Sequence, residues 1–171
     1  MSEDKPLVNR VANSGIITLD LEKWYPSQAF VHIDIKDYLF KGLILKEKDF
    51  RAALKEINWD EHLDKIILVY CSADAIVPSW AYMLIASYAA GIAADVVQAD
   101  EQGYLNLYYR ERIADLIAED YEDKRVVVKG CANKEIPVGA YLELTKMLKP
   151  RVKSLMFGEP CSTVPVYKKP K

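Results

Sequence analysis

The sequence predicts a three-layer α/β fold, in which a mostly parallel sheet is flanked by helices, with an N-terminal strand extension and an internal βα duplication. From residue 65 onward, short β-rich runs alternate with longer helical patterns, which is typical of a parallel sheet covered by helices. Two segments of the chain also resemble each other. The chain has 171 residues, of which 51% are hydrophobic, so it is long enough to bury a sizeable core. We therefore expect a single α/β domain over residues 1–171.

The N-terminal part begins with two strand patterns, residues 16–19 and 30–35. In the second, every other residue is apolar, as in a strand with one buried face. We expect these strands to form an extension that pairs antiparallel. A helix is predicted over residues 47–57, because apolar residues recur there with helical spacing.

Strands and helices alternate in the rest of the chain. The predicted strands are residues 65–70, 95–98, 125–129 and 153–157. The predicted helices are residues 78–90, 104–119 and 137–148. The first helix is apolar almost all round, which indicates deep burial or a partner chain, whereas the second has one apolar face. The lysine-rich end, residues 168–171, is expected to be a frayed, solvated tail.

Charge and composition exclude several classes of protein. With 23 basic and 25 acidic residues the net charge is −2, which argues against a nucleic-acid binder driven by phosphate contacts. The N-terminus carries acidic residues where a signal peptide needs a basic region, and the most apolar stretch, residues 80–94, is too short to cross a bilayer. No glycine pattern forms a phosphate-binding loop, so there is no nucleotide motif. We expect a cytoplasmic protein without membrane or nucleic-acid contacts.

The internal repeat is the most informative pattern. Residues 71–82 and 131–141 align with one residue of slack, and both segments end in P-x-x-A-Y. Each follows a predicted strand and opens a predicted helix, with proline in the first helical turn, where its missing N–H costs nothing. The repeat therefore places Cys71 and Cys131 in equivalent positions.

The third cysteine, Cys161, also follows a predicted strand. Ligands of open α/β sheets gather at the carboxyl ends of strands, so the three thiols share one edge if their strands are parallel neighbours. Three thiolates with an open position suit zinc, iron or an iron–sulfur cluster. The predicted metal ligands are Cys71, Cys131 and Cys161, with Asp74 and Glu159 as secondary candidates.

Other interpretations stay open beside this one. The three cysteines can be inert packing thiols, Asp74 can cap the following helix, and Glu159 can be an exposed loop carboxylate. His32 and Asp34 share a strand face, which suits a ligand with its supporting carboxylate, although a solvated strand face is the preferred interpretation.

Two further functional hypotheses belong to different classes. One is a thiol-dependent enzyme or sulfur carrier that uses Cys71 or Cys131, because a helix N-terminus stabilises a thiolate. The other is a non-catalytic, homo-oligomeric interaction protein, most simply a homodimer, suggested by the apolar first helix and the 11 tyrosines. No catalytic or cofactor-binding residue is assigned.

Five segments resemble those of a bacterial family known as domain of unknown function 2480, and the resemblance covers nearly the whole chain. These segments are residues 9–12 (NRVA), 34–37 (DIKD), 42–51 (GLILKEKDFR), 71–78 (CSADAIVP) and 158–165 (GEPCSTVP). The family has no established activity. An association of such genes with iron–sulfur cluster assembly genes implies a role in iron–sulfur cluster biogenesis, with iron–sulfur assembly proteins as partners.

Overall fold

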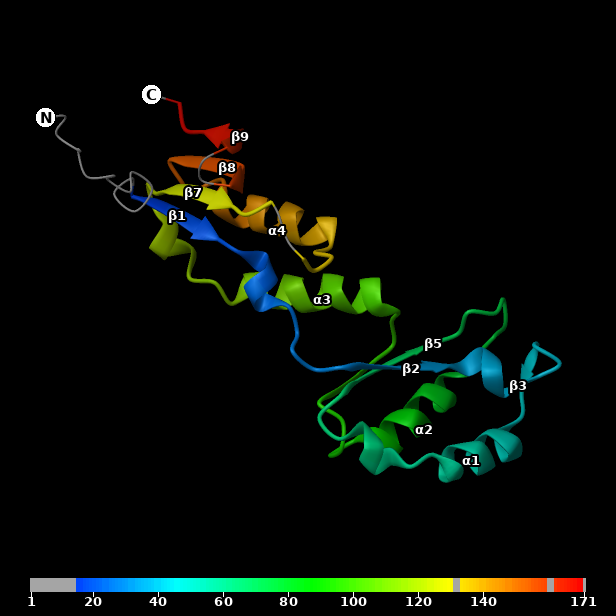
Figure 1. Cartoon of the computed structure of the whole chain (residues 1–171). Coiled ribbons are helices and arrows are strands. Elements are labelled where there is room, and N and C mark those ends of the chain that lie inside the picture. The colour runs from blue at the N-terminus through cyan, green and yellow to red at the C-terminus, as the bar shows by residue number, and fades with distance from the viewer. Residues whose placement is uncertain (1–14, 131–132, 160–161, 171) are drawn as a thin grey trace, which may run out of the picture. The chain divides into compact units, whose positions relative to one another are not determined.

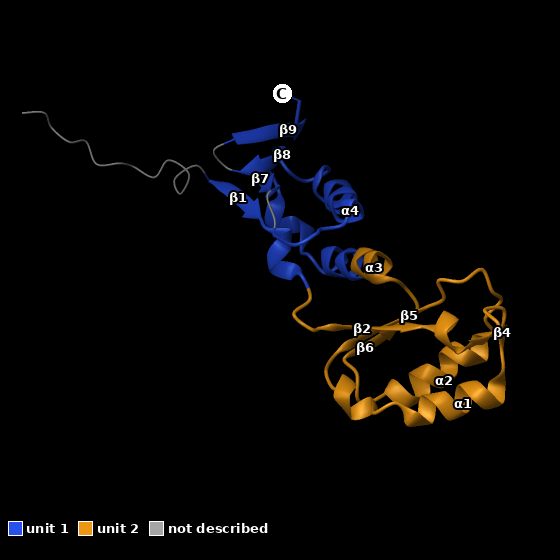
Figure 2. Cartoon of the chain, turned by 45° about the vertical axis from the view of Figure 1, so that its right-hand side comes forward, with its two compact units in different colours: residues 1–25, 108–171 blue, residues 26–107 orange. Residues whose placement is uncertain are grey.

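The computed structural model describes residues 15–130, 133–159 and 162–170 (Figure 1). The chain divides into two compact units, residues 1–25 with 108–171 and residues 26–107, called unit 1 and unit 2 (Figure 2). Each unit combines helices with a sheet of mostly parallel strands. The predicted α/β class is therefore confirmed, while a single domain stays a prediction about how the chain folds.

Unit 2 is built on a three-stranded parallel sheet with the order β2-β5-β6. Its strands are β2 (Phe30–Asp34), β5 (Ile66–Tyr70) and β6 (Asp95–Val97). A short hairpin, β3 (Leu39–Phe40) with β4 (Ile44–Leu45), precedes helix α1 (Glu47–Glu56), and helix α2 (Ser79–Ala89) follows β5. The four consecutive residues Ile66–Val69 are each at most 3% exposed, as expected for the central strand of a sheet covered on both faces.

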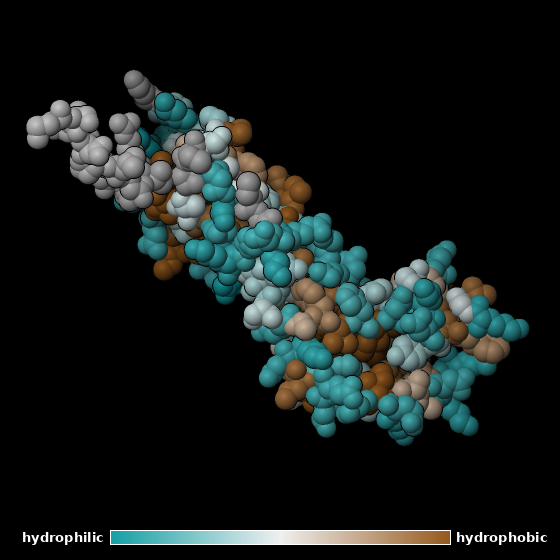
Figure 3. All heavy atoms as spheres, in the orientation of Figure 1, coloured by the Kyte–Doolittle hydropathy of each residue, from teal (hydrophilic) through white to brown (hydrophobic). Residues whose placement is uncertain are grey.

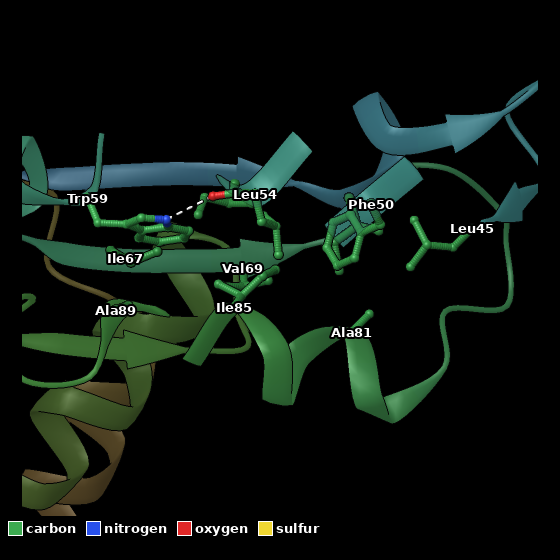
Figure 4. Close-up of a cluster of buried hydrophobic side chains, with 11 residues drawn as sticks. Leu45, Phe50, Leu54, Trp59, Ile67, Val69, Ala81, Ile85 and Ala89 are labelled. Atoms are coloured by element: carbon green, nitrogen blue, oxygen red, sulfur yellow. Dashed lines mark hydrogen bonds between the residues drawn. The ribbon is translucent and has the colours of Figure 1, made fainter. Parts of the chain in front are cut away.

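The core of unit 2 forms where α1 and α2 pack against β5 (Figure 4). Helix α1 buries Phe50 and Leu54, which lie one turn apart on its apolar side. The indole Nε1 of Trp59 donates a hydrogen bond to the Leu54 carbonyl at 3.0 Å, so this large side chain is buried with its polar atom satisfied.

Helix α2 differs from the expectation of deep burial all round. It buries the stripe Ala81, Ile85 and Ala89, while Met83 is 71% exposed. Ala81, Ile85 and Ala89 are spaced four residues apart and so share one side of the helix, and hydropathy alone does not show which side of an apolar helix faces the sheet.

Unit 1 contains a four-stranded sheet with the order β1-β7-β8-β9. Its strands are β1 (Ile16–Leu19), β7 (Arg125–Val128), β8 (Ser154–Glu159) and β9 (Ser162–Lys168), and helix α4 (Val138–Leu148) connects β7 to β8. The first three strands are parallel and β9 is antiparallel to β8. Helix α3 (Glu101–Ala114) crosses the boundary between the units at residues 107 and 108.

The N-terminal strands correct the predicted topology. Strand β1 pairs parallel with β7, and β2 pairs parallel with β5, so the expected antiparallel extension is wrong. Each is an edge strand of its own sheet, and an edge strand with one solvated face shows the same alternation whether its partner is parallel or antiparallel. The sequence pattern therefore reported the strands correctly but not their partners.

The C-terminal lysines also differ from the prediction of a frayed tail. Lys168 ends β9, and the backbone N–H of Lys169 donates to the Lys153 carbonyl at 3.0 Å. The Nζ of Lys169 lies 2.8 Å from Asp123 Oδ1. These bonds attach the chain end to the sheet as far as Lys169.

Hydrophilic side chains cover most of the face in Figure 3, with small hydrophobic areas between them. Within the described ranges, no helix has the length and apolarity needed to cross a membrane.

Candidate functional site

The carboxyl edge of the unit 2 sheet is organised by Asp34, the last residue of β2. Its Oδ1 accepts a hydrogen bond from the backbone N–H of Lys36 at 3.0 Å and so caps the 3₁₀ helix Ile35–Tyr38. The same carboxylate accepts two hydrogen bonds from Ser72, one from its backbone N–H at 3.0 Å and one from its hydroxyl. Because β2 and β5 are parallel and in register at Asp34 and Tyr70, Asp34 reaches the loop after β5 and holds the residue that follows Cys71.

These contacts determine the charge state of Asp34. Partial desolvation acts to raise the pKa of this carboxyl, but the hydrogen bonds from Ser72 and Lys36 outweigh it and hold the pKa below its ordinary value. Asp34 is therefore a carboxylate at neutral pH that is bonded to neutral donors. Its negative charge is not cancelled by a salt bridge in the described residues.

Cys71 lies in the loop between β5 and α2 as a half-buried free thiol. Its Sγ donates to the Ala73 carbonyl at 3.5 Å, and the side chain packs against the unit 2 core. The pKa of Tyr82 is raised by burial and, second, by the charge of Cys71. Helix α2 begins at Ser79, one residue later than predicted. Pro78 therefore occupies the N-cap position instead of the first helical turn.

The remaining candidates in unit 2 do not gather around Cys71. Asp74 is exposed and makes no hydrogen bond in the described part of the chain, so it does not cap α2. His32 is exposed and touches the Tyr70 ring edge to face, with centroids 6.1 Å apart. Residues 15–130, 133–159 and 162–170 contain no group of three or more potential ligands placed to hold a metal ion.

The carboxyl edge of the unit 1 sheet has a similar frame with different chemistry. Asp20 follows β1 and caps the 3₁₀ helix Leu21–Trp24 by accepting from Glu22 N–H at 3.2 Å. Lys129 follows β7, and its backbone N–H extends the ladder to the Leu19 carbonyl at 2.8 Å. The Lys129 Nζ lies 3.2 Å from Asp20 Oδ2. In unit 1 the partner of the aspartate is therefore a lysine, whereas in unit 2 it is Ser72.

Glu159 completes this group at the end of β8. Its Oε1 is shielded from solvent and has no hydrogen-bond partner among the described residues, so the expectation of an exposed loop carboxylate is wrong. The pKa of Lys129 is raised by its hydrogen bond with Asp20, by the charge of Asp20 and, less strongly, by the charge of Glu159. We call Asp20, Lys129 and Glu159 the Lys129 cluster. Since leaving a buried polar atom without a partner is costly, the Glu159 oxygen favours a further positively charged or donating group.

Cys131 and Cys161 lie outside the described residues, but their described neighbours in the chain are close together. A Cβ on Gly130 would lie 2.7 Å from the Phe157 ring and 3.3 Å from Gly158 Cα. Strands β7 and β8 are parallel and in register at Val128 and Phe157. The chain therefore approaches both cysteines from neighbouring strands of one sheet.

The three strands that precede the cysteines do not all share a sheet. The sequence left the strand order open; in the structure β7 and β8 are neighbours, whereas β5 pairs with β2 and β6 among the described strands. The condition for one common sheet edge is therefore met by β7 and β8 but not by β5, the strand before Cys71, whose neighbours are β2 and β6. Whether the three sulfurs meet stays a prediction.

Tyr82 and Tyr141, which close the two P-x-x-A-Y segments, were not predicted as site residues. Burial is the main cause of the raised pKa of Tyr141, and Asp20 is the second. Both tyrosines lie in the first turn of their helix, and burial is also the main cause of the raised pKa of Tyr82. The shared P-x-x-A-Y end of the repeat was the available signal for both tyrosines.

Comparison with known proteins identifies a family but no activity. Residues 5–169 match the family described as protein of unknown function DUF2480, and the chain belongs to that family. No curated protein and no solved structure matches the chain.

Proposed function

We propose that this member of a family without assigned activity is a metal-binding protein, with Cys131 and Cys161 as thiolate ligands and Glu159 as an oxygen ligand of zinc, iron or an iron–sulfur cluster. The observation that carries the proposal is the shielded Glu159 oxygen that has no partner among the described residues. A hard carboxylate oxygen beside thiolates is a donor set that zinc and iron accept.

The geometry of the described flanks supports this choice of ligands. Glu159 is the last residue of β8 and pairs with Ser162 of β9, and only residues 160 and 161 join them. Gly130, which precedes Cys131, lies against Phe157 and Gly158 of the same strand. A ligand from each of the two segments therefore requires no large movement of the sheet.

The charge of the Lys129 cluster is also compatible with a cation. Lys129 is bonded to Asp20, so its positive charge is largely balanced within the cluster. Glu159 then contributes a negative charge with no bonded partner among the described residues. Two thiolates would add to this negative charge, and a divalent cation would neutralise it.

Metal content of the full chain tests the proposal. The protein is purified without oxygen, its zinc and iron are measured by elemental analysis, and its absorption spectrum is recorded. We expect about one metal site per chain in the wild type, near-complete loss in Cys131→Ser and Cys161→Ser, and weaker retention against a chelator in Glu159→Gln. A wild-type protein without metal, both as purified and after anaerobic reconstitution, would overturn the proposal.

Cys71→Ser is the matched variant, because it removes a thiol from unit 2. Full metal content in Cys71→Ser would assign the site to the two unit 1 cysteines. Loss of metal equal to that in Cys131→Ser would instead assign Cys71 as the third thiolate, as the sequence predicts. A role in iron–sulfur cluster biogenesis, with assembly proteins as partners, belongs to the same proposal and requires that the bound species be an iron–sulfur cluster or iron.

A second candidate function, a thiol-dependent enzyme or sulfur carrier, is favoured by the arrangement around Cys71. Ser72 is held by two hydrogen bonds to Asp34, and the Cys71 Sγ donates to the Ala73 carbonyl of the same loop. A half-buried thiol at the end of a central strand is thereby kept in a fixed loop, which is how reactive thiols are presented.

Alkylation rates distinguish this second function. Iodoacetamide is added near neutral pH, and the modified peptides are quantified by mass spectrometry over time. We expect Cys71 to react at least about tenfold faster than Cys131 and Cys161 if it is the functional thiol, and Ser72→Ala to reduce this preference. Uniformly slow labelling of all three cysteines would reject it.

A further inference from the structure

A cavity of unit 1 lies at the opposite edge of its sheet from the Lys129 cluster. It has a volume of about 840 Å³ and opens at the amino-terminal ends of β7 and β8 and the carboxyl end of β9. Its charged lining residues are Arg125, Lys153, Lys168, Lys169 and Asp123, and Ser154, Met156 and Pro170 complete the lining. Four cations thus face one carboxylate in a chain whose net charge is −2.

The sheet register aligns two of these cations on the same face. Arg125 of β7 is paired with Ser154 of β8, and Ser154 is paired with Lys168 of β9. Paired residues of adjacent strands point to the same face, and neighbouring strands are about 4.8 Å apart. Arg125 and Lys168 therefore stand about 10 Å apart at their Cα atoms with the small Ser154 between them, which leaves space above the serine hydroxyl.

A β-bulge is responsible for the position of Lys168. The β8–β9 register shifts between Leu155 and Met156, so that Met156 is opposite Pro165 while Ser154 is opposite Lys168. Without the extra residue Tyr167 would face Ser154, and Lys168 would point to the other face. Bulges commonly re-aim a side chain in this way next to binding sites.

Most of the positive charge in the cavity is not neutralised by the protein. Asp123 is bonded to Lys169 at 2.8 Å, and this bond and charge lower the pKa of the Asp123 carboxyl. Arg125, Lys153 and Lys168 make no ion pair within the part of the chain that the structure describes. Like charges held close together repel one another, and a bound anion would relieve that repulsion.

We infer that this cavity is a binding site for a small, multiply charged anion of the phosphate class, with Arg125 and Lys168 as the two principal contacts and Ser154 as a hydroxyl donor between them. The volume is in the range of small-molecule pockets. The Arg125 guanidinium can donate two parallel hydrogen bonds to the oxygens of a diphosphate. The Lys153 and Lys168 ammonium groups can interact with its other oxygens as point charges. This inference is independent of the metal-binding proposal.

A small anion fits the observations better than a nucleic-acid strand. Three cations that make no ion pair among the described residues, Arg125, Lys153 and Lys168, line this one cavity, and the chain as a whole is slightly acidic. Nucleic-acid binding would require a longer track of cations for successive phosphates.

Isothermal titration calorimetry of the full chain with sodium pyrophosphate tests the site. We expect saturable binding of about one pyrophosphate per chain that weakens as salt is raised, and an affinity about tenfold lower in Arg125→Ala and in Lys168→Ala. Lys124→Ala is the matched control, since it removes an exposed cation next to Arg125 that does not line the cavity. It should change the affinity less than about twofold. Circular dichroism and the thermal midpoint confirm that each variant is folded, and Lys168→Gln replaces Lys168→Ala if the latter is not.

Three results would overturn the inference. The first is the absence of binding heat with pyrophosphate up to about 1 mM. The second is an equal loss of affinity in Lys124→Ala and Lys168→Ala, which would show attraction to general positive charge. The third is tighter binding of a single-stranded RNA oligonucleotide than of pyrophosphate, with loss in the same variants, which would assign the cations to a nucleic-acid partner.

Discussion

The carboxyl edges of the two sheets use the same backbone arrangement with different chemistry. In each unit the N-terminal strand ends at an aspartate that caps a 3₁₀ helix, Asp20 in unit 1 and Asp34 in unit 2. In each unit that aspartate also holds the segment after the neighbouring parallel strand. The partner is the Lys129 ammonium in unit 1 and the Ser72 hydroxyl and N–H in unit 2.

This difference determines the charge that each edge presents. In unit 1 the aspartate is balanced by a lysine, and the carboxylate left without a bonded partner among the described residues is Glu159. In unit 2 the aspartate itself keeps its charge, and it bonds to Ser72, the residue that follows the Cys71 thiol in the chain. The same frame therefore presents a carboxylate oxygen without a bonded partner among the described residues in one unit and a positioned thiol in the other.

The largest expected effect comes from Gly158, near the carboxyl end of β8 in unit 1. Gly158 has φ +123°, and a Cβ there would lie 2.6 Å from the Ser162 carbonyl oxygen. Gly158→Ala should lower the free energy of unfolding by about 3 kcal/mol, through backbone strain and overpacking together, as measured by urea denaturation.

Gly42→Ala in unit 2 is the control for strain alone, because Gly42 has φ +70° and open space around its Cβ position. It should cost only about 1 kcal/mol. Equal losses in the two variants would show that the contact with Ser162 contributes nothing and that the edge of unit 1 is no tighter than a surface loop.

The next effect concerns the acid sensitivity of the unit 2 edge. The folded-state pKa of Asp34 is below its unfolded value, so its stabilisation is present above the unfolded pKa of about 3.9 and is lost as pH falls through the folded pKa. Asp34→Ala should cost about 1 kcal/mol at pH 7 by removing the cap, and should reduce the loss of stability below pH 4.

Asp34→Asn separates the charge from the cap. It keeps an oxygen that can accept from Lys36 and Ser72 but loses the titrating group. Urea denaturation at intervals between pH 2.5 and 7 should show a smaller cost than in Asp34→Ala at pH 7, with the same reduced dependence on acid. An acid dependence identical to the wild type in both variants would refute the role of Asp34.

Much of the local structure was predictable, because it depends on short-range periodicity. The strand at residues 16–19 and the helices near 79–89 and 138–148 match within a residue. Strand β9 was missed because Pro165 interrupts its pattern, and proline is tolerated there only because β9 is an edge strand.

The partners of each element were not predictable from the same patterns. Lys129 and Asp20 are 109 positions apart in the chain, and a contact of that separation depends on which strands become neighbours. The repeat placed Cys71 and Cys131 in equivalent sequence positions, but equivalent positions in two sheets do not form one edge. Asp34 was considered as a support for His32, whereas it bonds to Ser72, because a strand pattern does not show which loop lies beyond it.

A smaller effect of opposite pH sign is expected at the unit 1 edge. The pKa of Lys129 is raised by its hydrogen bond and charge interaction with Asp20, so its stabilisation is complete below the unfolded pKa of about 10.4 and is lost as pH rises through the folded pKa. Lys129→Met, which keeps an apolar side chain of similar length, should flatten the decline in stability above pH 10. Lys146→Met, at an exposed pair with Glu143, is the control and should leave that decline unchanged.

The smallest expected effect tests whether the apolar helix of unit 2 serves a homodimer. Met83 is 71% exposed on α2, and an exposed methionine contributes little to the stability of a monomer. Met83→Ser should change the free energy of unfolding by less than about 0.5 kcal/mol in a monomer.

If α2 is the face of a homodimer, the same variant should instead raise the dissociation constant about tenfold in sedimentation experiments, because a side chain at the centre of an interface loses its burial there. A wild-type protein that sediments only as a monomer at micromolar concentration would reject the homodimer, and α2 would then expose Met83 without a partner chain, much as α4 of unit 1 exposes Leu142.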